Sequence, residues 1–102
     1  MKEEILFKIH KSYRNTISIC DLELYGKKFV EGIKQLDLTG RFYEGEKISI
    51  EESWSRVLDW AIEDATFNIV GKKSINVALG TKIITKKDIG YVDGIPFALV
   101  LL

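Results

Sequence analysis

The sequence predicts an α+β fold: a mostly antiparallel sheet with one long helix and one short helix packed on it. Two runs near the N-terminus alternate apolar and polar residues, as half-buried strands do. A central run carries apolar residues at helical spacing, and the last six residues are apolar on both faces, as in a buried strand. With 102 residues, 46% of them apolar, the chain is expected to form a single domain over residues 1–102.

The first two alternating runs predict a β-hairpin with its loop at residues 12–14. Its register pairs Ile9 with Ile17 and Phe7 with Ile19, which places the apolar side chains on one face. A slip of one residue would put polar side chains on that face, so the register is well specified.

Residues 20–32 follow the hairpin and are longer and more complex than an ordinary connector. We expect a structured crossover in which Gly26 and Gly32 adopt unusual backbone angles. Three apolar side chains would anchor it to the core and two lysines would point outward: Leu22, Leu24 and Phe29, and Lys27 and Lys28. A third short strand is expected at residues 33–38.

Ser49 and Glu52 stand at the N-cap and N3 positions of a capping box, which predicts the start of a helix. Gly71 is a natural residue to follow the end of that helix. The pattern therefore predicts one helix over residues 50–70, about five turns long. Its apolar stripe comprises Trp54, Val57, Leu58, Ala61, Ile62, Ala65 and Ile69.

The C-terminal third predicts a short helix over residues 72–79, closed by Gly80, and a brief strand at residues 82–85. Asp93 and Gly94 are typical of a two-residue hairpin turn. Pro96 is then expected at a strand start or edge, before a central buried strand at residues 97–102.

Charge and composition narrow the functional classes. The net charge is zero, but residues 1–20 and 67–102 are basic and residues 21–66 are acidic. If the two ends meet, they would form a basic face; the alternative is a mixed, solvated surface. With one cysteine, no secretory signal and no apolar run near the roughly 20 residues of a membrane span, we expect a cytoplasmic protein that does not contact a membrane.

No catalytic residue, metal ligand or cofactor is predicted. Cys20 and His10 are the only cysteine and histidine, but the hairpin register pairs Cys20 with Leu6. His10 then lies on the order of 13 Å along the strand, beyond hydrogen-bonding reach. Cys20 is expected to be a buried apolar residue and His10 to be solvated. A cleft lined by the polar residues of the crossover, Asp21, Glu23 and Lys27, is the remaining enzymatic hypothesis.

Residues 70–74 resemble a phosphate-binding loop but fail its pattern, because Thr66 replaces the first glycine and Lys73 stands where Ser or Thr is required. A helix start near Gly71, with Lys72 and Lys73 beside it, could still hold a phosphate. The alternative is a joint between two helices with solvated lysines.

Trp60 and Phe67 are seven residues apart and would share a face of the long helix, away from its main stripe. Either the helix is buried on two sides, or these aromatic residues contact a partner or a second copy of the chain.

Several short blocks, in order, resemble a small archaeal family, the domain of unknown function family 424. The most informative members of these blocks are Cys20, Asp21, Glu23, Gly26, Lys27, Phe29, Glu31, Gly32, Gly94 and Pro96. The resemblance implies an RNA-binding or translation-associated protein. Family members tend to have histidine where this chain has Phe97 and a polar residue where it has Leu99, and this difference favours binding over catalysis.

Two functional hypotheses follow. The first is a module that binds RNA or a ribonucleoprotein, with contacts from Lys8, Lys11, Tyr13, Arg14, Lys27, Lys28, Lys72 and Lys73. The neutral net charge counts against it, since dedicated nucleic-acid binders are usually basic. The second is a non-catalytic protein-interaction module, including a homodimer, that uses Trp60 and Phe67.

Overall fold

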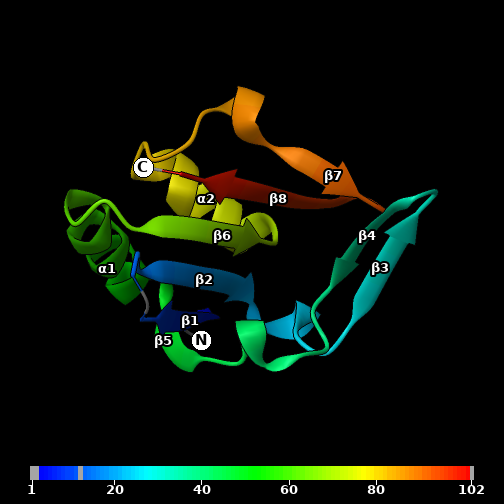
Figure 1. Ribbon diagram of the computed structural model, residues 1–102, viewed down its shortest axis with the longest axis horizontal. Coiled ribbons are helices and arrows are strands. Elements are labelled where there is room, and N and C mark those ends of the chain that lie inside the picture. Colours follow the sequence, from blue (N-terminus) through cyan, green and yellow to red (C-terminus); the bar gives the residue numbers. More distant parts are fainter. Residues whose placement is uncertain (1–2, 12, 102) are drawn as a thin grey trace.

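The computed structural model describes residues 3–11 and 13–101, and it has an α+β fold. Within these residues, six strands form one sheet in the order β5-β1-β2-β6-β8-β7, and β3 and β4 form a separate hairpin. Helices α1 (Ile50–Ile62) and α2 (Lys72–Gly80) pack against the large sheet (Figure 1). The strands are β1 (Glu4–His10), β2 (Thr16–Asp21), β3 (Lys28–Glu31), β4 (Lys34–Asp37), β5 (Glu46–Ser49), β6 (Thr66–Val70), β7 (Gly90–Val92) and β8 (Ile95–Val100).

The N-terminal hairpin has the predicted register. Ile9 lies opposite Ile17 and Phe7 opposite Ile19. All four side chains belong to the main hydrophobic core, which lies between the sheet and the helices. Of the predicted loop, residue 12 lies outside the described residues.

Helix α1 begins as predicted but ends earlier. The Ser49 hydroxyl accepts a hydrogen bond from the Glu52 backbone N–H, 3.1 Å away, and so caps the first turn. The helix stops at Ile62, and Asp64 has a left-handed backbone with φ of 57°. The prediction of a five-turn helix over residues 50–70 is therefore wrong, because residues 66–70 form β6 instead. Three of those five residues are β-branched and one is aromatic, which favours a strand.

Strand β6 makes the sheet mixed, where the sequence predicts one that is mostly antiparallel. It pairs in parallel with β2 and antiparallel with β8. Phe67 lies on this strand and is fully buried in the main core. It shares no helix face with Trp60, so the predicted surface formed by these two residues does not exist in this fold.

The C-terminal third agrees with most of the predictions. Helix α2 ends at Gly80, and Asp93 and Gly94, with φ of 51° and 77°, form the turn between β7 and β8. The expected strand at residues 82–85 is wrong: these residues form a turn that leads into the 3-10 helix η3 (Lys86–Asp88). Strand β8 does lie between β6 and β7, but Leu99 is 55% exposed, so it is not buried on both faces as predicted.

Residues 20–32 form more regular structure than the predicted crossover. They end β2, make the 3-10 helix η1 (Leu22–Leu24) and build β3. Gly26 and Gly32 do have positive φ angles, of 87° and 63°. The β3–β4 hairpin reaches toward the turn between β7 and β8, where the Glu31 carboxylate accepts a hydrogen bond from the Asp93 N–H at 2.7 Å (Figure 1).

This hairpin, with η1 and the 3-10 helix η2 (Arg41–Tyr43), covers part of the sheet face opposite the helices. A second hydrophobic core lies beneath it. Leu6, Cys20, Leu38 and Val70 form its buried centre, and Leu22, Leu24, Tyr25, Phe29, Leu36, Tyr43, Ile95 and Phe97 pack against them. Neither α-helix in the described part of the chain is long and apolar enough to cross a membrane.

Candidate nucleic-acid interface

The start of α2 is held by a carboxylate from the end of β2. Asp21 accepts hydrogen bonds from the backbone N–H groups of Lys73 and Ser74, at 3.0 and 2.8 Å, and from the Ser74 hydroxyl at 2.8 Å. Gly71 has φ of 107°, and a Cβ there would lie 2.2 Å from the Asp21 carboxyl carbon. A phosphate would use the same N–H groups. The protein's own carboxylate therefore occupies the position that the loop sequence offers to a phosphate.

Glu23 interacts electrostatically with two of the predicted contact lysines, Lys73 and Lys27. Its carboxylate lies 3.1 Å from the Lys73 ammonium group. Burial acts to raise the pKa of Glu23, but hydrogen bonds from its own backbone and from Lys73, with the charges of Lys73 and Lys27, outweigh burial and lower the pKa. Asp21 and Glu23 do line a hollow of about 260 Å³ beside the start of α2, but Lys27 is not among its lining residues. Both carboxylates already have partners there, since Asp21 caps α2 and Glu23 pairs with Lys73.

The predicted RNA contacts lie in two regions. Lys27 and Lys28 at the start of β3 and Lys72 and Lys73 at the start of α2 lie toward the carboxyl ends of β2 and β6 (Figure 1). Lys11, Tyr13 and Arg14 lie in the connection from β1 to β2, toward the opposite end of the sheet. Lys8 lies in the middle of β1, opposite Ser18, and its ammonium group donates to the Arg41 carbonyl at 2.9 Å. Along β2 the two ends are about 20 Å apart.

A groove of about 470 Å³ lies beside α2, between this helix, η3 and the β7–β8 hairpin. This volume is within the roughly 300–1,000 Å³ that small-ligand sites occupy. Its lining residues are Lys72, Ile75, Asn76, Leu79, Lys86, Ile89, Tyr91 and Pro96.

The polar residues of this groove are suited to an anionic, partly aromatic ligand. Its charged lining residues, Lys72 and Lys86, are both lysines. Tyr91 is 56% exposed, and Asn76 is also exposed. The sequence prediction missed Lys86, Asn76 and Tyr91. A local charge count would have pointed to Lys86, but no local pattern marks Asn76 or Tyr91. Residues 72–87 contain five lysines and no Asp or Glu.

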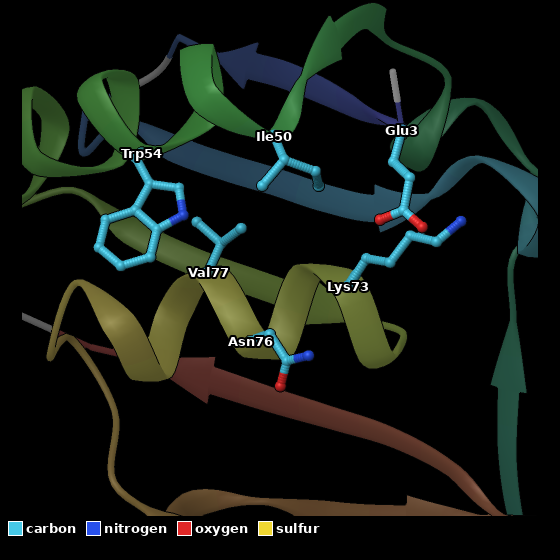
Figure 2. A pocket seen from close by; sticks show the side chains of 6 residues that line it. All are labelled: Glu3, Ile50, Trp54, Lys73, Asn76 and Val77. Carbon is cyan, nitrogen blue, oxygen red and sulfur yellow. The ribbon is translucent and has the colours of Figure 1, made fainter. Parts of the chain in front are cut away.

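A second, smaller hollow lies on the other side of α2, between this helix and the start of α1. Figure 2 shows Trp54 and Ile50 facing Val77 at one end, while Glu3 and Lys73 approach each other at the opposite end. Its volume of about 140 Å³ is below the range for small-ligand sites. We therefore place the candidate interface on the groove side of α2.

The sequence predicts a solvated His10, but in the structure its ring has protein partners. Its ring stacks on Phe42 with centroids 4.3 Å apart, and its Nε2 lies 2.9 Å from the Phe42 carbonyl and 3.3 Å from the Ser18 hydroxyl. A histidine beside a serine resembles a base and a nucleophile. However, Ser18 is 1% exposed and its hydroxyl donates to the Phe42 carbonyl, so a substrate has no access to it.

Cys20 is a buried core residue, as predicted. Burial, with smaller contributions from the charges of Asp21 and Glu23, raises the pKa of its thiol to about 12. A thiol with this pKa is protonated at neutral pH and is a poor nucleophile.

The chain is similar to known proteins over nearly its whole length. One solved structure, described as a crystal structure of an uncharacterized conserved protein from Methanopyrus kandleri, superposes with a TM-score of 0.85. The two chains are 19% identical, and the match covers 96% of this chain and 92% of the other, which establishes the fold. No curated protein matches. The family model described as "Protein of unknown function (DUF424)" matches residues 9–102, and the chain therefore belongs to that family.

Proposed function

We propose that the protein binds single-stranded RNA through the groove between α2, η3 and the β7–β8 hairpin. The observation that carries the proposal is the combination of Lys72 and Lys86 with the exposed Tyr91 around one concave surface. Single-stranded nucleic acids are held by lysines that contact phosphates and by aromatic rings on which bases stack.

Each polar group of the groove has a role in this proposal. Lys72 and Lys86 contact successive phosphates, while a base stacks on the Tyr91 ring. Asn76 offers an amide that can donate to and accept from the edge of an unpaired base. The apolar floor shields the stacked base from water.

The zero net charge is compatible with modest affinity. Acidic residues are concentrated in the middle of the sequence, whereas residues 72–87 are purely basic, so attraction is local. The family resemblance favours an RNA of the translation apparatus, and co-sedimentation with isolated ribosomal subunits tests that narrower target.

Fluorescence anisotropy with a labelled single-stranded RNA of about 12 nucleotides tests the proposal at salt concentrations from roughly 50 to 300 mM. We expect binding that weakens as salt rises. Replacing both Lys72 and Lys86 with Ala removes two phosphate contacts. The negative slope of log K against log salt then becomes shallower by about 1.4. Tyr91→Ala weakens binding about tenfold, since stacking on an aromatic ring contributes roughly 1–3 kcal/mol per base.

Matched variants outside the groove are the controls. Lys8→Ala with Lys11→Ala removes the same charge, and Tyr13→Ala removes a fully exposed aromatic ring. We expect both controls to bind RNA like the parent protein. Absence of binding at the lowest salt concentration, or equal losses in the control and groove variants, would show that the groove is not an RNA site.

A further inference from the structure

Helix α1 exposes an apolar ridge that the fold covers only at its first residue, Trp54, whose ring lies against Gly80 of α2. Trp54, Leu58 and Ile62 follow one another at intervals of four residues, and their side chains are 39%, 45% and 80% exposed. Residues spaced in this way lie above one another on one face of a helix. The helix meets the sheet with other residues, notably the fully buried Ser53 and Val57. The ridge is thus a second apolar face, in addition to the one that the core requires.

Carboxylates border this ridge. Asp59 and Glu63 are exposed and lie one turn apart. Asp59 is a neighbour of Ile62 on the helix surface, because residues three apart are adjacent there, so the two carboxylates lie beside the ridge. No ion pair links either of them to a basic group within the described residues. The only basic residue of α1, Arg56, is paired with Glu46 and Glu52. Like charges one turn apart repel each other, and a cationic partner would relieve that repulsion.

The acidic line also borders a hollow. Asn15, Asp59, Trp60 and Glu63 line an open depression of about 500 Å³ on this side of the molecule. An aromatic ring beside two carboxylates suits the positively charged end of a lysine or arginine side chain. The predicted partner residue Trp60 thus borders this surface, although Phe67 does not contribute to it.

A second copy of the chain is a poor occupant. In an antiparallel two-fold contact through the ridge, each flank of α1 faces the same flank of its partner. The Asp59 and Glu63 lines would then oppose each other without compensating charge. RNA is excluded by the same negative charge.

We propose that α1 docks a basic amphipathic helix of a partner protein. The apolar side of that helix covers Leu58 and Ile62, and its lysines or arginines pair with Asp59 and Glu63. Docking of an amphipathic helix on a complementary apolar surface is a common mode of recognition, and the charges fix its orientation. This surface is independent of the groove proposed for RNA.

A synthetic leucine–lysine peptide of about 18 residues, roughly five helical turns, is the probe. Titration calorimetry measures its affinity, and amide chemical shifts locate its site. We expect binding that weakens with salt and shifts confined to α1 and residues near Asn15. A leucine–glutamate peptide with the same pattern is expected not to bind.

Two variants separate the apolar and charged contributions. Ile62→Ser removes the most exposed residue of the ridge and is expected to weaken binding about tenfold, since a buried aliphatic side chain contributes roughly 1.5–3 kcal/mol. The control Ile33→Ser removes a fully exposed isoleucine at the β3–β4 turn and should have no effect. Circular dichroism checks that each variant is folded.

Asp59→Asn with Glu63→Gln should weaken binding and flatten its salt dependence. The control, Glu31→Gln with Asp93→Asn, changes the net charge equally where the end of the β3–β4 hairpin meets the β7–β8 turn, and it should bind normally. The proposal is overturned if neither ridge nor acidic variants lose affinity relative to their controls, or if the shifts map elsewhere. It is also overturned if analytical ultracentrifugation detects a dimer of the parent protein that the Ile62→Ser variant does not form. That result would assign the ridge to a second copy of the chain.

Discussion

The carboxylate of Asp21 receives both hydrogen bonds that Ser74 can donate. The Ser74 backbone N–H and hydroxyl each lie 2.8 Å from the same oxygen, Oδ1, and both residues are buried. The contact joins the end of β2 to the first turn of α2, across more than fifty residues of sequence. It places a negative charge at the positive end of the helix dipole, where it is stabilising. Asp21 therefore has a structural role in this fold.

Replacing Asp21 with Ala is expected to destabilise the protein by about 2–4 kcal/mol. Loss of an N-cap costs roughly 1–2 kcal/mol, and a buried hydroxyl left without its partner costs about 1–3 kcal/mol. Urea denaturation followed by circular dichroism measures this difference. We expect the slope of the transition to be unchanged, since the same surface is exposed on unfolding.

Asp37→Ala is the control for this substitution. Asp37 is exposed, and its carboxylate accepts hydrogen bonds from the backbone N–H and the hydroxyl of its neighbour Thr39. Its loss should change stability by about 0.5 kcal/mol or less. Equal destabilisation by the two substitutions would show that the buried capping position of Asp21 at the start of α2 has no special effect on stability.

The Cys20 thiol is expected to be unreactive in the folded protein and to make stability fall at alkaline pH. Burial raises its pKa to about 12, whereas the thiol of the unfolded chain ionises near 9.0. Below pH 9 both states keep the proton, and the stabilising effect is fully present. Between pH 9 and 12 only the unfolded state releases the proton, so stability falls by up to ~1.4 kcal/mol per pH unit.

Urea midpoints at several pH values, together with thiol titration by a chromogenic disulfide, check this prediction. Burial also raises the pKa of Tyr43 to about 12, and its ionisation acts in the same direction. Cys20→Ala retains Tyr43, whose pKa is raised mainly by burial and partly by the charge of Cys20. The difference between the two pH profiles therefore measures the thiol together with its coupling to Tyr43. Rapid modification of native Cys20 at pH 8 would contradict the prediction.

Local patterns predicted those elements whose partners are close in sequence. The register of β1 and β2 follows from the alternation of Phe7 and Ile9 with Ile17 and Ile19, because only one pairing places all four on the core face. The Asp93–Gly94 turn likewise follows from the backbone angles that its two residues tolerate.

Contacts between distant segments were beyond these patterns. Strand β6 becomes a strand by pairing with β2 and β8, and its Ile69 matches the helical period of α1 equally well. Strand β3 is short, and its pairing with β4 depends on a second core on the other face of the sheet. The groove was missed for the same reason, since Lys86 and Tyr91 meet α2 only through the fold of the C-terminal third.

The backbone at Asp64 provides a test of why α1 ends where it does. With φ of 57°, this exposed residue adopts a left-handed conformation that costs most residues other than glycine roughly 1–2 kcal/mol. Asp64→Gly removes that cost but makes the unfolded chain more flexible, so we expect a net gain of about 0.5–1 kcal/mol. Asp64→Val should instead lose about 1 kcal/mol or more, because a β-branched residue is poorly tolerated there.

Thermal unfolding measures these changes, and 1 kcal/mol corresponds to a shift in Tm of about 4–8 °C for a domain of this size. Asp64→Asn removes the charge but keeps a residue that tolerates the left-handed region, so it separates charge from conformation. Asp59→Gly, inside α1, should lose about 1 kcal/mol. If glycine stabilises the protein at Asp64 and destabilises it at Asp59, the left-handed backbone at Asp64 is what ends the helix. If glycine changes stability in the same direction at both residues, it is not.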